Sequence, residues 1–148
     1  MPVTGGCRCG ACRYSLDYPA IPVIYACHCR DCQTATGGGF VLQAMIPEAC
    51  LSVTGERVDR SAPNSRGAVT TQVYCTQCLT RLYSTNTGRP GIVLVRAGTL
   101  DNSDTIVPAV HMWASRRQPW IGLSSDAEAY DGAIPVDRIM QVFAPNFA

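Results

Sequence analysis

Apolar side chains occupy every second position in several short segments of this 148-residue chain. Such alternation is typical of β-strands that bury one face, because successive side chains of a strand point to opposite faces. Glycine, proline and polar clusters separate the segments, so each predicted strand is short. The predicted strands span residues 12–16, 23–26, 40–46, 50–54, 68–74, 79–83, 91–100 and 106–113. A mainly β fold of mostly antiparallel strands follows from this pattern.

Little helix is expected between the strands. Residues 33–36 could form one helical turn before the three glycines at 37–39, and residues 135–143 show helical spacing of apolar positions. The polar stretch 56–67, with Pro63 near its tip, predicts a surface loop. The sequence therefore predicts only one helix of more than a single turn.

The composition fits one domain with an ordinary core, since 47% of the residues are hydrophobic. We therefore expect residues 1–148 to form a single domain. The formal net charge is +1, from twelve arginines and eleven acidic residues, with no lysine. The sequence shows no basic stripe of the kind that neutralises a nucleic-acid backbone, so nucleic acid is not an expected partner.

The first residues have neither the basic segment nor the apolar run of a secretory signal, and no apolar stretch reaches the length of a membrane span. We therefore expect a cytoplasmic protein with no membrane partner. In that reducing compartment, clustered cysteines are more often metal ligands than disulfides. The count of nine cysteines also fits poorly with a closed disulfide framework.

Three of these cysteines lie within six residues, in the segment Cys27-His28-Cys29-Arg30-Asp31-Cys32. Thiolates are soft ligands that zinc holds tetrahedrally, and C-x-C-x-x-C spacing lets three sulfurs converge on one ion. Structural zinc sites close the fourth position with protein, whereas catalytic sites leave it for water or substrate. The fourth ligand could still be His28, Asp31 or a distant cysteine, so the spacing leaves both kinds of site open.

A second set of cysteines bears on this choice. Cys7 and Cys9 form a C-x-C pair near the N-terminus, and Cys75 and Cys78 form a C-x-x-C pair far downstream. Together they could make a complete four-thiolate zinc site that needs nothing from the central segment. The C-x-x-C pair also lies between two predicted strands, as in a zinc-ribbon knuckle.

The last two cysteines are expected to lie in the core. Cys12 falls within a predicted strand and Cys50 stands among apolar neighbours, and free cysteine usually behaves as a small buried hydrophobe. His28 lies between two expected ligands. Its side chain is therefore expected to point away from the metal and to support the site indirectly.

Four motifs, in this order along the chain, resemble those of the glutathione-dependent formaldehyde-activating enzymes and their relatives, which include centromere protein V. They are Gly5-Gly6-Cys7-Arg8-Cys9-Gly10, Cys27-His28-Cys29-Arg30-Asp31-Cys32, Cys75-Thr76-Gln77-Cys78 and His111-Met112-Trp113-Ala114-Ser115-Arg116-Arg117-Gln118-Pro119-Trp120. The resemblance implies an Mss4-like fold of curved antiparallel sheets with zinc knuckles. It also implies a structural zinc ion on Cys7, Cys9, Cys75 and Cys78, and a catalytic zinc ion on Cys27, Cys29 and Cys32.

The resemblance further implies a reaction between a small-molecule thiol and an aldehyde. In the family this reaction is the reversible addition of glutathione to formaldehyde, which gives S-(hydroxymethyl)glutathione. A member would then be a carbon–sulfur lyase or ligase.

The chemistry of a three-thiolate zinc site agrees with such a reaction. Three thiolates leave zinc with a formal charge of about −1, which makes it a poor Lewis acid for water activation. We expect instead that its open position takes a substrate thiol, lowers the pKa of that thiol and presents it to an aldehyde carbon. The developing alkoxide needs a hydrogen-bond donor, and the candidates are His111, Arg30 and the backbone amides of residues 37–39.

Other interpretations remain open from the sequence. His111 could instead be a strand histidine bonded to backbone, and Trp113 and Trp120 are expected to be packing residues rather than substrate platforms. The protein could also be a zinc-stabilised binding module without catalysis, because a fold does not fix a function. A redox role for the central cysteines is less favoured, because their C-x-x-C lacks a thioredoxin-like βαβ context.

Overall fold

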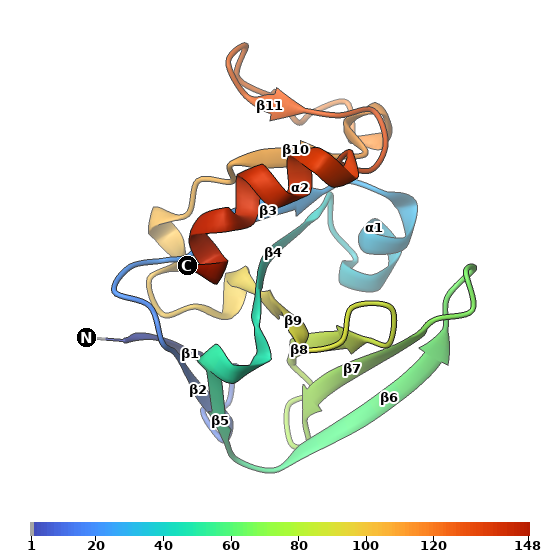
Figure 1. Ribbon diagram of the computed structural model, residues 1–148. Coiled ribbons are helices and arrows are strands. Elements are labelled where there is room, and N and C mark those ends of the chain that lie inside the picture. The colour runs from blue at the N-terminus through green and yellow to red at the C-terminus, as the bar shows by residue number, and fades with distance from the viewer. Residues whose placement is uncertain (1) are drawn as a thin grey trace.

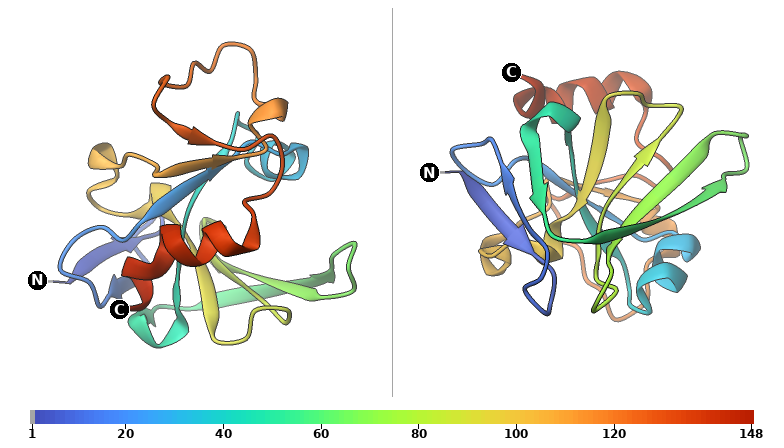
Figure 2. Two further views of the ribbon diagram at one scale, coloured as in Figure 1. Left: turned by 45° about the horizontal axis from the view of Figure 1, so that its top comes forward. Right: turned by 90° about the horizontal axis from the view of Figure 1, so that it is seen from below.

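A computed structural model describes residues 2–148 and consists mainly of two β-sheets (Figure 1). The small sheet has the strand order β1-β2-β5, and both of its pairings are antiparallel. The large sheet has the order β11-β10-β3-β4-β9-β8-β7-β6 and curves through the molecule (Figures 1 and 2). The prediction of a mainly β fold with curved antiparallel sheets is therefore confirmed.

The individual strands are short, as the alternation predicts. The small sheet contains β1 Val3–Gly6, β2 Arg13–Leu16 and β5 Leu51–Thr54. The large sheet contains β3 Ile24–Cys27, β4 Val41–Pro47, β6 Arg57–Pro63, β7 Val69–Cys75, β8 Arg81–Asn86, β9 Ile92–Arg96, β10 Val110–Met112 and β11 Glu128–Ala129. The α-helices are α1 Arg30–Thr36 and α2 Val136–Phe143, and the 3-10 helices are η1 Glu48–Cys50, η2 Ala97–Thr99, η3 Ser103–Thr105, η4 Ala114–Arg116 and η5 Ala144–Phe147. No helix within residues 2–148 combines the length and the apolar character needed to cross a membrane.

The large sheet separates two hydrophobic clusters, because side chains alternate between the faces of each strand. The inter-sheet cluster lies between the two sheets and includes Val3, Tyr14, Leu16, Ala44, Ile46, Val93 and Val95. The α2 cluster lies on the opposite face and includes Tyr25, Val41, Met45, Leu94, Val110 and Phe143. Neighbouring residues of β4 and of β9 thus contribute to different clusters.

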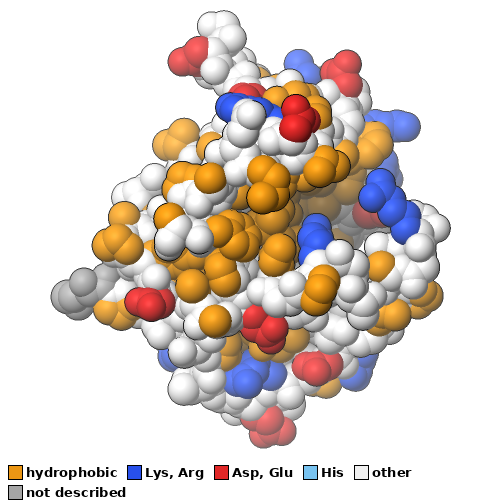
Figure 3. Space-filling model, viewed as in Figure 1, with side chains coloured by type: hydrophobic (Ala, Val, Ile, Leu, Met, Phe, Trp, Pro, Cys, Tyr) orange, Lys and Arg blue, Asp and Glu red, His pale blue; other side chains and the backbone are white. Residues whose placement is uncertain are grey.

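Helix α2 lies across the second of these faces (Figures 1 and 2). Phe143 is buried and Ile139 packs beside it, whereas Val136 and Met140 are exposed. Hydrophobic side chains therefore gather on the surface in this region, beside a hollow (Figure 3). The helix predicted from the spacing of apolar residues over 135–143 is confirmed.

The prediction that residues 56–67 form a surface loop is wrong. Residues Arg57–Pro63 form β6, which pairs with β7 along its whole length. Almost every side chain of β6 is exposed, so the alternation that marks a half-buried strand is missing. Backbone pairing, rather than burial, defines this edge strand.

The predicted strand over 106–113 is correct only at its end. Only Val110–Met112 forms a strand, β10, and it pairs in parallel with β3 and with β11. Pro108 has no N–H to donate to a ladder, which accounts for the late start of the strand. The antiparallel arrangement therefore does not extend to this edge of the large sheet.

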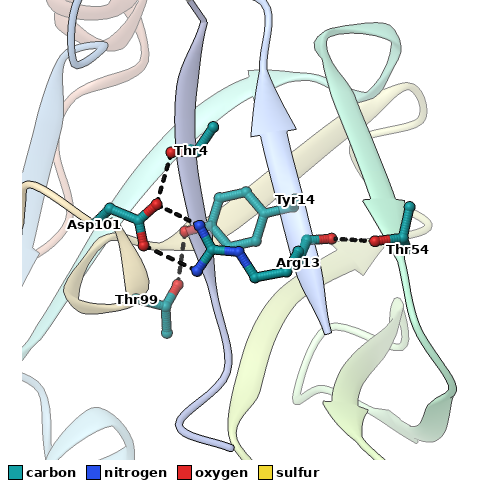
Figure 4. A network of polar contacts seen from close by, with 6 residues as sticks. All are labelled: Thr4, Arg13, Tyr14, Thr54, Thr99 and Asp101. Atoms are coloured by element: carbon teal, nitrogen blue, oxygen red, sulfur yellow. Dashed lines mark hydrogen bonds and ion pairs between the residues drawn. The ribbon is translucent and has the colours of Figure 1, made fainter. Parts of the chain in front are cut away.

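A polar network joins the small sheet to the segment after β9 (Figure 4). Arg13 of β2 forms a two-pronged ion pair with Asp101, in which Nη1 lies 3.0 Å from Oδ1. The Thr4 hydroxyl of β1 donates to the same carboxylate over 2.6 Å. Beside it, the hydroxyls of Tyr14 and Thr99 lie 2.7 Å apart. These contacts hold β1 and β2 against the rest of the protein.

Candidate metal centres

Four thiols from two turns that are distant in sequence meet at one point, and we call them the four-cysteine group. Cys7 and Cys9 follow β1, Cys75 ends β7, and Cys78 lies in the turn before β8. The sulfur of Cys9 lies 3.5 Å from that of Cys7 and 3.8 Å from that of Cys75, and all four lie within 4.8 Å of one another. Sulfurs that bind one tetrahedral zinc ion at about 2.3 Å are about 3.8 Å apart, so the group could hold a metal ion.

Hydrogen bonds fix the sulfurs of both turns. The N–H of Cys12 donates to the sulfur of Cys7 over 3.2 Å. The Thr80 hydroxyl lies 3.1 Å from the sulfur of Cys78. Hydrogen bonds with the side chain and the backbone of Thr80 are the main cause that lowers the pKa of Cys78, to about 5, which favours its thiolate form.

The two cysteines expected in the core lie in or against the inter-sheet cluster. Cys12 is fully buried, and its sulfur donates to the carbonyl of Glu56 over 3.2 Å rather than joining the four-cysteine group. Cys50 is half-buried at the end of η1 and packs against the same cluster. Both positions agree with the expectation of small, packed side chains.

The three-cysteine group lies on the other face of the large sheet. Cys27 ends β3 and belongs to the α2 cluster, against which Cys29 and Cys32 also pack. The sulfur of Cys29 caps α1 by accepting a hydrogen bond from the N–H of Cys32 over 3.4 Å. This cap explains why α1 begins at Arg30, earlier than the helical turn predicted over 33–36. All three sulfurs lie within 4.8 Å of one another.

Across residues 2–148, no fourth histidine, cysteine or carboxylate joins the three-cysteine group. Asp31 is exposed on α1, and His28 is buried with its ring directed to His111. The group could therefore hold a metal ion with one position left for a ligand that is not part of the protein.

The pKa values of the three thiols are shifted in different directions. A hydrogen bond from Cys32 lowers the pKa of Cys27 to about 6. The same pairing raises the pKa of Cys32, and burial raises the pKa of Cys29. A thiolate at Cys27 thus opposes ionisation of its two neighbours, because like charges at this distance repel. A bound cation would allow all three sulfurs to ligate as thiolates.

His111 pairs with His28, which lies between Cys27 and Cys29 in the sequence. His111 lies on β10 opposite Ala26 of β3, and its Nδ1 is 3.0 Å from Nε2 of His28. The two rings are stacked, with centroids 5.3 Å apart. Burial lowers the pKa of both imidazoles, so both are neutral at pH 7 and share one N–H between them.

The chain is similar to known proteins in both sequence and fold. The model of the glutathione-dependent formaldehyde-activating enzyme family matches residues 2–116. The chain belongs to this family. The fold is also similar to that of a Rhodobacter sphaeroides protein known from a crystal structure, with a TM-score of 0.53 and 18% identity over 71% of this chain and 97% of that chain. Among curated proteins, no significant match was found.

In this member of the formaldehyde-activating enzyme family, the second predicted donor, Arg30, is exposed at the start of α1. Its guanidinium donates to the side-chain oxygen of Gln33 over 3.3 Å. Gln33 is buried, and its amide donates to the carbonyls of His28 over 2.8 Å and Arg116 over 2.9 Å. Arg30 is therefore connected through Gln33 to the backbone beside the three-cysteine group.

Two of the glycine amides proposed as donors are already used. The N–H of Gly37 donates to the carbonyl of Gln33 over 2.8 Å, and that of Gly38 donates to the hydroxyl of Thr36 over 3.2 Å. These bonds end α1, with Gly37 in the left-handed conformation that glycine favours. The structure thus gives this glycine run a capping role.

The prediction that Trp120 is a packing residue is wrong, because 73% of its side chain is exposed. Its ring covers Gly39, where a Cβ would lie only 3.3 Å from the indole. Trp113 is also at the surface, with one ring edge near Gly132. Sequence reasoning treated both tryptophans as packing residues, although they belong to the irregular segment around η4.

Sequence reasoning also missed two arginines, Arg81 on β8 and Arg96 at the end of β9. They line a cleft of about 590 Å³ that is bordered by α1 and β4, the elements that flank the three-cysteine group. The signal that could have found them is a charge within an apolar strand, as in the run Ile92-Val93-Leu94-Val95-Arg96.

Proposed function

We propose that this protein is a zinc-dependent enzyme that makes and breaks the carbon–sulfur bond between a thiol and an aldehyde. Membership of the glutathione-dependent formaldehyde-activating enzyme family supports glutathione and formaldehyde as the substrates. Their adduct would be S-(hydroxymethyl)glutathione. The observation that carries the proposal is the three-cysteine group, which leaves room for an outside ligand. We further propose a cytoplasmic location, because a reducing compartment keeps thiol ligands free of disulfides.

Zinc fits both groups because their donors are sulfur only. We assign a structural ion to Cys7, Cys9, Cys75 and Cys78, and a catalytic ion to Cys27, Cys29 and Cys32. Four sulfurs saturate a tetrahedral ion, whereas three do not. Zinc bound to the three-cysteine group would lower the pKa of a substrate thiol and so supply a nucleophilic sulfur.

The addition forms one bond and transfers one proton. The thiol loses its proton, its sulfur attacks the aldehyde carbon, and the carbon–sulfur bond forms as the π electron pair of the carbonyl moves to oxygen. The oxygen then takes up a proton and becomes the hydroxyl of the adduct. In the reverse direction, the hydroxyl loses its proton and the carbon–sulfur bond breaks. The protein therefore needs a donor for the developing alkoxide.

We propose His111 as that donor. When Nε2–H of His28 donates to Nδ1 of His111, the buried Nδ1 of His28 is an acceptor without a proton. The opposite tautomer would bury an unpaired N–H, a group that is rarely left without a partner in folded proteins. The favoured tautomer leaves His111 with its proton on Nε2, from which it can donate to a ligand.

Arg30 is proposed as a second, charged donor. Only one contact, to Gln33, uses the five N–H groups of its guanidinium. Because the side chain is exposed, it can reorient toward a ligand beside α1. Its permanent charge would offset the negative charge of an alkoxide near three thiolates.

The test is NMR exchange spectroscopy of glutathione and formaldehyde with their adduct. We expect the protein to speed the interconversion above the uncatalysed rate. The Cys29→Ser variant should lose this acceleration and one zinc ion per chain while it stays folded. The control is Cys50→Ser, which removes a thiol outside both groups and should keep activity and metal.

Retained turnover in Cys29→Ser would contradict the assignment of the site. If the unaltered, fully zinc-loaded protein gives no acceleration with glutathione or other thiols, the proposed function is wrong. The zinc-stabilised binding module would then be the better interpretation.

A further inference from the structure

The cleft beside the three-cysteine group contains two cations without counter-ions. Its walls carry Arg81, Arg96, Tyr74, Gln72 and Leu79, and no aspartate or glutamate lines it. Both arginines are half-buried, and in each the Nε atom is buried without a hydrogen-bond partner. The two ion pairs found within residues 2–148 involve other arginines.

A half-buried guanidinium whose Nε is buried without a hydrogen-bond partner is an unusual feature in a folded protein. Removing a cation from water without a partner is costly, so buried charges are normally paired. Burial and the charge of Arg96 lower the pKa of Arg81 to about 10, and burial lowers the pKa of Arg96. Arg81 therefore keeps its charge at neutral pH, and the guanidinium of Arg96 is likewise cationic, because arginine is not deprotonated in proteins. The cleft is thus a positive site without a protein anion.

The cleft lies on the same face of the large sheet as the three-cysteine group. Arg96 is opposite Gln43 of β4, and the Gln43 amide donates to the hydroxyl of Tyr25, a member of the α2 cluster, over 2.9 Å. Ala35 and Thr36 of α1, the helix that also carries Cys32, line the cleft as well. One bound molecule could therefore reach both the sulfurs and the guanidinium groups.

Leu79 adds a second unusual feature to the same cleft. Its φ of +59° is in the left-handed region, where a side chain other than glycine is strained. The side chain is 65% exposed and lines the cleft rather than packing in the core. Strained residues of this kind are concentrated at functional sites.

We infer that Arg81 and Arg96 bind a carboxylate of the thiol substrate, so that the enzyme selects thiols that carry an anionic group. The inference rests on the proposed function for the reacting end of that molecule. A guanidinium matches a carboxylate with parallel hydrogen bonds, and two of them can hold it in a fixed direction. A cleft of about 590 Å³ also has the size of an ordinary small-molecule site.

The test compares two short thiols that differ in charge, 3-mercaptopropionate and 2-mercaptoethanol, each with formaldehyde. The measurement is the ratio of their kcat/KM values in the zinc-loaded protein. In Arg81→Gln, Arg96→Gln and the double variant, the ratio should shift away from the anionic thiol by about tenfold or more, because a charged hydrogen bond is lost. The control Arg60→Gln, on the exposed face of β6, should keep the ratio.

If the ratio of kcat/KM values is unchanged in the double variant, the inference about the arginines is wrong. Turnover of the thiols by that variant would still support the proposed function. If no thiol reacts, the anion site is tested separately. The measurement is then the binding of S-methylglutathione, monitored by NMR titration. Binding that weakens about tenfold in the double variant supports the site. Absent binding, or binding equal in both proteins, overturns it.

Discussion

The four-cysteine and three-cysteine groups bring thiols together in different ways. The first takes two sulfurs from the turn after β1 and two from the turn between β7 and β8, and it lies at the inter-sheet cluster. The second takes all its sulfurs from residues 27–32 and lies at the edge of the α2 cluster, near a cleft. A long-range, closed group is suited to stabilising the fold, whereas a local, open group is suited to binding a ligand.

The surroundings of the two groups sharpen the contrast. In the four-cysteine group, Cys7 and Cys75 are buried, Cys78 is half-buried and Cys9 is exposed. The segment of the three-cysteine group contains the buried His28, which pairs with the half-buried His111, and two arginines without ion pairs line the nearby cleft. Polar groups without partners thus accumulate around the second group, where they are expected if selection favours binding over stability.

The largest effect is expected from Cys75→Ser. Cys75 is fully buried at the end of β7, and its loss should abolish the structural metal site that joins distant segments. Metal binding of this kind contributes about 10 kcal/mol or more to folding. The variant should show no cooperative thermal transition by circular dichroism, whereas Cys29→Ser should keep one. A Cys75→Ser protein that melts within a few degrees of the unaltered protein would remove the distinction between the groups.

Metal removal should follow the same division. With a chelator and a colorimetric zinc indicator, release should have a fast phase from the open three-cysteine group and a slow phase from the four-cysteine group. The fast phase should be absent in Cys29→Ser, and unfolding should accompany only the slow phase. A single phase that coincides with unfolding would mean that the groups are equivalent.

A smaller effect is expected at the knuckle of the four-cysteine group. Leu79→Gly removes a strained left-handed leucine directly after Cys78 and should raise the free energy of unfolding by about 0.5–1 kcal/mol. The measurement is denaturant unfolding of the zinc-loaded protein. The matched control is Val107→Gly, whose side chain is 83% exposed and whose φ is not positive, and which should lower stability. Equal losses in both variants would show that Leu79 is not strained.

The smallest effect concerns the support of the first cysteine turn. Asp101→Asn weakens the network in which Arg13, next to Cys12, is anchored, and should lower stability by about 0.5 kcal/mol at neutral pH, as for other surface pairs. Hydrogen bonds from Arg13 and Thr4 lower the pKa of Asp101, so its contribution is present above the ordinary carboxyl pKa of about 3.9. That contribution is lost as pH falls through the folded-state pKa.

Thermal melts at pH 7 and at pH 3 check the sign of this effect. The difference between the unaltered protein and Asp101→Asn should be larger at the higher pH. Asp104→Asn, which removes an exposed carboxylate outside the network, serves as the control. A difference that grows as pH falls would contradict the assigned role.

Much of this arrangement can be predicted from sequence because cysteine spacing and strand alternation are local signals. The grouping of the seven ligand candidates, the buried Cys12 and the helix over 135–143 all follow from such signals. The strand β6 does not, because its exposed side chains leave no alternation and only pairing with β7 reveals it. The parallel pairing of β10 with β3 likewise depends on contacts between distant segments.

The cleft shows the same limit at the level of the site. Arg81 and Arg96 come from neighbouring strands and face one space only because of the register and twist of the large sheet. The local sequence does not reveal that both arginines lack an acidic partner. The pairing of His28 with His111 across 83 positions is equally a product of the fold.

The sequence separation within each group has a consequence for how the protein is made. The segment 27–32 offers all three of its thiols as soon as it leaves the ribosome, and it closes only a short loop around a metal ion. The four-cysteine group must wait until residue 78 has been synthesised and a much longer loop has closed. We therefore expect the nascent chain to bind its first metal ion at the three-cysteine group. This is also the group that is expected to release its metal first to a chelator.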